Sequence, residues 1–174
     1  MFDKLAQRGG YWMLMLVIGL AMEGIALFYQ YELDYGPCVL CIHIRILVAA
    51  LILFSLLALL LRGSRGGRLF SNFGTFLISA AMLERSWQTL GIEQGWIESA
   101  CSMDLGLPDW LALDGWFPAV FEAWEACGYT PELLFGITMA QGLVAMSAGL
   151  LLLSLLTTLG TLASRPERNM FAGL

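Results

Sequence analysis

Charged residues are scarce in this chain. Of its 174 residues, 9 are Lys or Arg and 14 are Asp or Glu, so that only 13% are charged, whereas 59% are hydrophobic. The mean hydropathy is +0.74. These figures do not suit a soluble domain, in which about a quarter of the residues are charged. The composition therefore excludes a soluble globular protein and indicates a membrane protein.

Histidine and cysteine are also scarce, with one His and four Cys. The cysteines form a close pair, Cys38 and Cys41, and a distant pair, Cys101 and Cys127. A CxxC pair is often half of a zinc site, but the remaining candidate ligands are His43 and two widely spaced cysteines. The scarcity of ligands therefore argues against a metal site.

Four apolar stretches are long enough, or nearly long enough, to cross a bilayer as helices, which takes roughly 20 residues each. They run over about residues 11–29, 42–61, 69–90 and 133–156, and their charges are Glu23, Arg45, Glu84 and Arg85. The first stretch is longer than a signal peptide core and lacks a convincing cleavage site, so we expect it to be retained. We find no internal repeat. The sequence predicts an all-α membrane protein, one domain built as a four-transmembrane-helix bundle.

The distribution of cations predicts the orientation. Seven of the nine cations precede the first stretch, link the second to the third, or follow the fourth, and the positive-inside rule assigns these segments to the cytoplasm. Both termini are then cytoplasmic, and two loops of about residues 30–41 and 91–132 lie outside. The longer loop holds eight acidic residues and no cation, and nothing in this pattern indicates nucleic-acid binding. The seven cations are Lys4, Arg8, Arg62, Arg65, Arg68, Arg165 and Arg168.

The close pair has the features of a redox-active dithiol. Two intervening residues let both sulfurs meet across a single turn. Pro37 disfavours helix in the residues before it, which places Cys38 at the start of the second span. A helix N-terminus lowers a thiol pKa. Arg45 follows Cys41 by four residues and so shares its helix face, where its charge favours the Cys41 thiolate. We interpret Cys41 as a thiolate electron donor.

The distant pair allows two interpretations. Taken alone, Cys101 and Cys127 are typical of a structural disulfide in an exported loop. However, both pairs lie on the outer side or at its boundary, where disulfides persist if the compartment is oxidising. Two pairs in one compartment favour thiol–disulfide exchange between them.

The segment from Gly36 to Arg45, GPCVLCIHIR, resembles the PCxLCxxxR signature of the DsbB family, which are quinone-dependent thiol oxidases of the bacterial inner membrane. The resemblance extends to Ala21-Met22-Glu23, to LPDWL (107–111) and DGWFP (114–118) in the long loop, and to four spans with both ends inside. Two positions depart from the pattern. His43 stands where the family often has an aromatic residue, and Ile44 where a glutamate often precedes the arginine.

The resemblance implies a relay on the periplasmic side of the inner membrane. A reduced DsbA-type protein, a thioredoxin-fold oxidase, would attack a Cys101–Cys127 disulfide, with Cys101 forming the mixed disulfide. Cys127 would then exchange with Cys38. Electrons would leave from Cys41 to ubiquinone or menaquinone, assisted by Arg45. The four cysteines are thus the expected catalytic residues, and Cys41 and Arg45 the expected quinone contacts.

Two other functions remain open from the sequence. One is a dedicated paralogue that serves a specialised oxidase partner. The other, from a different class, is a non-catalytic membrane protein with a structural loop disulfide and a metal-binding or idle CxxC.

Two further features have an undecided role. Glu23 is a carboxylate inside a span, which is a functional candidate by default but serves equally well in a helix-to-helix hydrogen bond. Aromatic residues in the long loop alternate with acids, as in a short amphipathic helix on the bilayer surface or an ordinary aromatic belt. We favour the surface helix. The residues concerned are Trp110, Trp116, Phe117, Phe121 and Trp124, with Asp114, Glu122 and Glu125.

Overall fold

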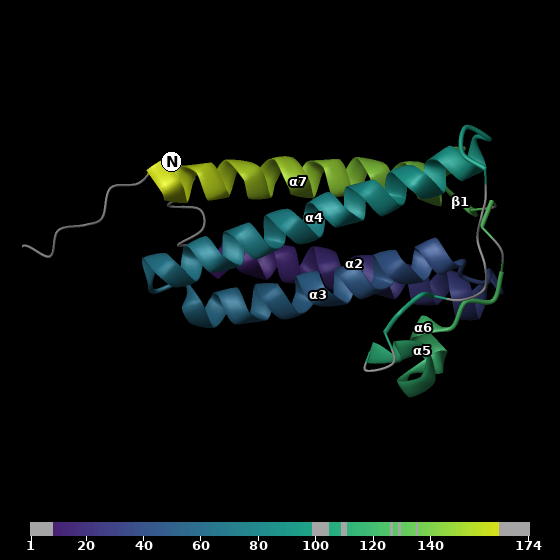
Figure 1. Cartoon of the computed structure of the whole chain (residues 1–174), viewed down its shortest axis with the longest axis horizontal. Helices are drawn as coiled ribbons and strands as arrows, with labels where there is room; N and C mark the ends of the chain where they lie inside the picture. The colour runs from purple at the N-terminus through teal and green to yellow at the C-terminus, as the bar shows by residue number, and fades with distance from the viewer. Residues whose placement is uncertain are drawn as a thin grey trace, which may run out of the picture.

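The structure, a computed structural model, describes residues 9–98, 105–108, 111–125, 127–128, 130–134 and 136–163. Four long helices run side by side along the molecule (Figure 1). At one end of this bundle lie two single-turn helices and a two-stranded antiparallel hairpin. The long helices are α2 (Gly9–Glu32), α3 (Val39–Leu61), α4 (Arg65–Glu93) and α7 (Met139–Ala163). The short elements are α5 (Leu113–Trp116), α6 (Pro118–Phe121), β1 (Glu132–Leu134) and β2 (Ile137–Thr138).

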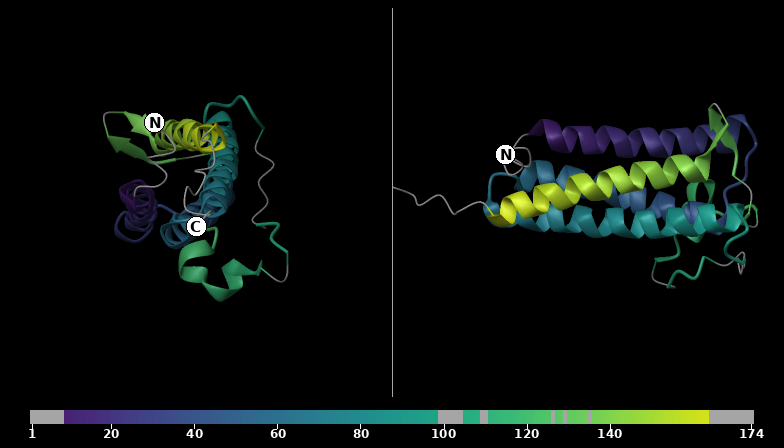
Figure 2. Two further views of the ribbon diagram at one scale, coloured as in Figure 1. Left: turned by 90° about the vertical axis from the view of Figure 1, so that its left-hand side faces the viewer. Right: turned by 90° about the horizontal axis from the view of Figure 1, so that it is seen from above.

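The two ends of the bundle differ in chemistry. α2 begins and α7 ends at the same end (Figure 2), and there the Arg65 guanidinium donates a hydrogen bond to the Leu162 carbonyl at 3.5 Å. At the other end α3 begins directly after Cys38, beside the hairpin and the loop helices. The described cations that link α3 to α4 thus lie far from the close cysteine pair. Lys4, Arg8, Arg165 and Arg168 fall outside the described residues.

Three helices in the described part of the chain are long and apolar enough to cross a membrane, namely α2, α3 and α7. They establish a multi-pass, mostly helical membrane protein. The stretch expected to form the third span is α4, which is as long as the others but less apolar. Its lower hydropathy comes partly from small polar residues that are buried in the bundle, such as Ser71, Thr75 and Ser79, and partly from charged residues such as Glu84 and Arg85 that are not buried.

α4 and α7 pack along a seam of small hydroxyl side chains. Ser86 and Ser147 are fully buried, and their Oγ atoms lie 3.3 Å apart. Most other hydroxyls of the seam donate to carbonyls of their own helix, as Thr75 does to Ser71 at 2.8 Å. Outside the seam α4 exposes Phe73, which is 53% accessible. Small, hydrogen-bonded residues inside and apolar residues outside are typical of helices packed within a membrane. The other buried hydroxyl residues are Ser79, Thr89, Ser154, Thr157, Thr158 and Thr161.

The largest apolar cluster lies where α2 and α3 meet the rest of the bundle. Trp12, Met15, Leu51 and Met82 are fully buried in it. A second, smaller cluster surrounds the start of α3 and includes Cys38 and loop residues. The loop is therefore packed on the bundle at the close cysteine pair.

Two segments differ from the expected helices. α7 begins at Met139 rather than near residue 133, because the preceding residues form the β1–β2 hairpin, which turns at Gly136 with a φ of +77°. The aromatic loop segment forms α5 and α6 rather than a single surface helix. The break is at Phe117, whose φ of −135° and ψ of 62° are not helical, since the following Pro118 disfavours helix there. Trp110 lies outside the described residues.

The α4–α7 seam can be tested with two leucine substitutions in α7. Ser147→Leu adds volume at a fully buried position, so we expect it to lower the free energy of unfolding by about 1–3 kcal/mol. Ala145→Leu, two residues away on an exposed position, is the control and should change it by about 0.5 kcal/mol or less. Denaturant unfolding in detergent micelles measures both. Equal effects of the two substitutions would contradict the packing described for α7.

Candidate redox site

The two sulfurs of the close pair meet at the first turn of α3. Cys38 is the N-cap residue, with φ −83° and ψ 167°, and its Sγ accepts a hydrogen bond from the Cys41 backbone N–H at 3.3 Å. The two Sγ atoms lie 2.8 Å apart, and both cysteines are free thiols. Cys38 is buried at 3% exposure, whereas Cys41 is partly exposed. The pair can therefore interconvert between dithiol and disulfide with little movement of the backbone.

The surroundings of Cys38 favour its thiolate. The hydrogen bond from the Cys41 thiol is the main cause that lowers the pKa of Cys38, to about 7; burial opposes it, and backbone N–H groups lower the pKa further. An attacking thiol is most effective when its pKa is near the ambient pH, because it is then both ionised and nucleophilic. Cys38 is thus suited to thiol–disulfide exchange.

The long loop returns to the bundle directly beside Cys38. Its backbone forms a parallel bridge there, between Cys38 and Glu125, and the Trp124 N–H donates to the Pro37 carbonyl at 3.0 Å. Gly36 permits this approach, because a Cβ at its position would lie 2.9 Å from Glu125 Cγ. The segment just before Cys127 is therefore held against the segment that carries the close pair.

Cys127 shares an apolar cluster with the close pair. It is buried at 8% exposure, and it packs in one cluster with Cys38, Leu105 and Ile42. Cys127 is disulfide-bonded, and neither Cys38 nor Cys41 is its partner, since both are free. Cys101 lies outside the described residues. The structure thus brings three of the four expected redox cysteines together.

Arg45 is buried at 5% exposure, one turn of α3 beyond Cys41. Its guanidinium donates from Nη1 to the Gln30 side-chain oxygen at 2.5 Å and to the Val120 carbonyl at 2.9 Å. From Nη2 it donates to the Ala26 carbonyl at 2.9 Å. A buried guanidinium needs such partners to offset the loss of water. Arg45 therefore joins α3 to α2 and to the loop helix α6.

Two further side chains of α2 hold α6, and the sequence analysis did not single out either. Gln30 is 1% exposed, and its Nε2 lies 3.5 Å from the Ala119 carbonyl. The Tyr31 hydroxyl donates to the same carbonyl. The sequence contained one indication that Gln30 belongs to the site. It is an amide seven residues after Glu23, so that both side chains lie on the same face of α2.

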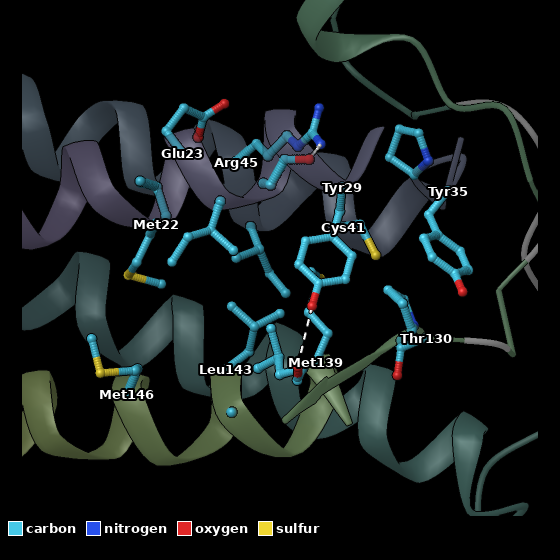
Figure 3. Close-up of a pocket in the computed structure, with 18 of the residues that line it drawn as sticks. Met22, Glu23, Tyr29, Tyr35, Cys41, Arg45, Thr130, Met139, Leu143 and Met146 are labelled. Atoms are coloured by element: carbon cyan, nitrogen blue, oxygen red, sulfur yellow. Dashed lines mark hydrogen bonds between the residues drawn. The ribbon is translucent and has the colours of Figure 1, made fainter. Parts of the chain in front are cut away.

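A mostly apolar cavity of about 380 Å³ lies between α2, α3, α7 and the hairpin. Figure 3 shows Glu23, Cys41 and Arg45 along one side of it and Leu143 and Met146 of α7 along the other. The hydroxyl of Tyr29, which also lines the cavity, donates to the Glu132 carbonyl at 3.1 Å. Its size and lining are those of a small-molecule site, with few polar groups in an apolar wall. The other lining residues include Met22, Tyr35, Thr130, Pro131 and Met139.

His43 contacts the long loop. One ring nitrogen, Nε2, lies 2.9 Å from the Leu105 carbonyl, so it carries the proton and donates. His43 is not among the residues that line the cavity. Among the residues that the structure describes, no three His, Cys, Asp or Glu side chains gather as metal ligands do.

Glu23 lines the cavity beside Arg45 (Figure 3). Both of its carboxyl oxygens are buried, and within the described part of the chain neither has a hydrogen-bond partner. The helix-to-helix hydrogen bond, one of the two roles open to Glu23 from the sequence, is therefore not formed.

The fold and the site together define a multi-pass helical membrane protein with a close pair of free cysteines beside an apolar cavity. The chain belongs to the family of "Disulfide bond formation protein DsbB", whose model matches residues 8–157. The family resemblance expected from GPCVLCIHIR is thereby confirmed. The protein is a membrane oxidoreductase of disulfide bond formation.

Individual relatives match over nearly the full chain. "Disulfide bond formation protein B" of Yersinia enterocolitica is 27% identical over 98% of this chain and 97% of that protein. The protein of the same name from Haemophilus influenzae is 28% identical over 98% of each. The protein of the same name from Shewanella loihica is 32% identical over 81% of this chain and 83% of that protein.

The lowered pKa of Cys38 can be tested by removing the Cys41 thiol, whose hydrogen bond is the main cause of the shift. In the reduced protein, alkylation of Cys38 by iodoacetamide should rise with pH around a midpoint of about 7. In Cys41→Ala the thiol hydrogen bond is lost, so the midpoint should rise toward the ordinary value of about 8.5. Cys41→Ser is the control, because its hydroxyl still donates and should give a smaller rise. Mass spectrometry of the Cys38 peptide measures the midpoint; an unchanged value in Cys41→Ala would contradict this cause.

The role of Arg45 in holding α6 can be tested by hydrogen exchange. Arg45→Met removes the donor to the Val120 carbonyl. A hydrogen bond to a charged group contributes about 1.5–3 kcal/mol, so the Phe121 and Glu122 amides should exchange about tenfold faster or more. The control is Arg85→Met, because the partners of Arg85 among the described residues, Glu84 and Gln88, belong to its own helix. Unchanged exchange in α6 would show that Arg45 does not hold it.

Proposed function

We propose that this protein oxidises a DsbA-type dithiol protein on the periplasmic side of the bacterial inner membrane and passes the electrons to a membrane quinone. The observation that carries the proposal is the position of Cys41 and Arg45 on the wall of an apolar cavity, while Cys38 shares a cluster with Cys127. One end of the close pair thus meets the loop cysteine, and the other meets a site for a small apolar molecule.

The proposal includes four membrane spans, with α4 as the third. At about 1.5 Å per residue, its 29 residues extend about 43 Å, which exceeds a hydrocarbon core of about 30 Å. Its exposed face is apolar at Phe70, Phe73 and Leu77, which supports contact with lipid. An even number of spans places both termini on one side, and the cations Arg62, Arg65 and Arg68 favour the cytoplasm.

The exchange steps follow from the cysteine positions. The partner's thiolate attacks a Cys101–Cys127 disulfide, forms a mixed disulfide with Cys101 and releases Cys127; the partner's second thiol then displaces Cys101 and leaves as a disulfide. Cys127, reduced in this exchange, attacks Cys38 of an oxidised Cys38–Cys41 disulfide and releases Cys41; Cys101 then displaces Cys38 and restores the Cys101–Cys127 disulfide. The packing of Cys127 in one cluster with Cys38 supports this step, and the Cys38 pKa of about 7 makes Cys38 a good leaving thiolate. Each cycle moves two electrons from the partner's dithiol to the Cys38–Cys41 pair.

The cavity residues fit a quinone ring. The walls are apolar, Cys41 faces the interior from α3, and Arg45 supplies a fixed positive charge one turn away (Figure 3). A quinone bound there supplies a two-electron acceptor that is reduced by a thiolate. Cys41 is oriented toward it by its helix, and Arg45 stabilises negative charge that develops beside Cys41. Ubiquinone and menaquinone share this chemistry.

The test is single-turnover quinone reduction. Purified protein in detergent is mixed with a reduced DsbA-type protein and ubiquinone or menaquinone, and the quinone absorbance is followed. Wild type should reduce quinone, and Cys41→Ser should not, because it lacks the sulfur that faces the cavity. A partner variant whose second cysteine is replaced by serine should stay attached to Cys101 as a mixed disulfide, because no second thiol displaces Cys101. If wild type reduces no quinone with several partners, the relay is wrong, and a structural role for the loop disulfide becomes the better account.

A further inference from the structure

The proposed reaction moves protons as well as electrons. Reduction of a quinone to a quinol takes up two electrons and two protons, whereas oxidation of two thiols releases two of each. The cavity is mostly apolar, so a proton must reach the acceptor from a side chain or from water at the cavity mouth. A positioned acid typically accelerates such a step by about 10²–10⁴-fold.

The titratable or charged side chains that line the cavity are Glu23, Tyr29, Tyr35, Cys41 and Arg45. Cys41 supplies the electrons, and Arg45 keeps its proton because a guanidinium remains charged in proteins. The Tyr29 hydroxyl already donates to the Glu132 carbonyl. Tyr35 belongs to the α2–α3 connection, and a phenol is a much weaker acid than a carboxyl group. Glu23 is the remaining group, and neither of its oxygens has a hydrogen-bond partner among the described residues.

The position of Glu23 in α2 places it beside the charge that would stabilise its deprotonated form. Ala26 and Gln30 follow it by three and seven residues, on the same helix face, and both accept hydrogen bonds from Arg45. Glu23 therefore precedes, on this face, the two α2 residues that hold the guanidinium. Arg45 in turn lies one turn beyond Cys41 in α3.

We propose that Glu23 is the proton donor to the quinone during its reduction, an inference that rests on the proposed function. Glu23 gives its proton to an oxygen of the acceptor as electrons leave Cys41, and the resulting carboxylate faces Arg45. When the Cys38–Cys41 disulfide forms, one of the two thiol protons returns to Glu23 and the other passes to water. The second proton of the acceptor comes from water, so that protons and electrons balance.

The test compares Glu23→Gln, which cannot donate a proton, with Glu23→Asp, which can. Single-turnover quinone reduction should fall about 100-fold or more in Glu23→Gln and recover in part in Glu23→Asp. Quinone affinity, measured by tryptophan quenching, should stay within about threefold of wild type in both variants, because the amide keeps the shape of the carboxyl group. The control is Glu84→Gln on the exposed face of α4, where the side chain is 58% exposed; it should match wild type.

A second readout does not depend on quinone. In protein stripped of quinone, with the Cys38–Cys41 pair reduced, the infrared spectrum should contain the band of a protonated Glu23 carboxyl group, because Glu23 must hold its proton before turnover. The band should be present in wild type and Glu84→Gln, and absent in Glu23→Gln.

Three results would overturn the inference: wild-type turnover in Glu23→Gln, no Glu23-dependent band of a protonated carboxyl group, or a loss of turnover matched by an equal loss of quinone affinity. The last result would make Glu23 a binding residue instead. Failure of the proposed function is distinct, because wild type itself would then reduce no quinone.

Discussion

The buried guanidinium of Arg45 is the constraint on which the arrangement of the site depends. A charge removed from water must be hydrogen-bonded nearly completely, and Arg45 achieves this with acceptors from two other elements, Gln30 and Ala26 of α2 and Val120 of α6. The requirement sets the distance between α2 and α3 at the cavity and docks a loop helix on the bundle. The same side chain therefore organises both the wall of the cavity and the loop above it.

The docking of α6 determines where the loop cysteine lies. Only a few residues separate Val120 from the segment that pairs with Pro37 and Cys38, and Cys127 follows directly in the same apolar cluster as Cys38. Movement of Cys127 away from Cys38 must therefore strain or break the hydrogen bond from Arg45 to Val120. In the proposed relay, the state of the loop is thus transmitted to the side chain next to Cys41.

Spacing along the chain was enough to predict some of these features but not others. Pro37 and the CxxC spacing located the start of α3, and the four-residue step from Cys41 located Arg45 on the same face. The acceptors of Arg45 were not predictable, because two of them are backbone carbonyls, which have no sequence signature. The hairpin was missed because Leu133 continues an apolar run into α7. Hydropathy alone ranks α4 below the other helices because it cannot show that the hydroxyl groups of α4 are buried in the bundle.

The two cysteines of the close pair have different surroundings although one turn of helix separates them. Cys38 packs against the loop cluster that contains Cys127, whereas Cys41 lines the cavity. Exchange with the loop cysteines requires a sulfur that Cys127 can reach and that leaves readily as a thiolate, and Cys38, with a pKa of about 7, meets that requirement. Delivery of electrons to a small apolar acceptor requires a sulfur on an apolar wall beside a positive charge, and Cys41 meets this second requirement. The N-terminus of α3 satisfies both requirements at once. Cys38 faces the loop from the first turn, and Cys41, three residues later, faces the bundle interior.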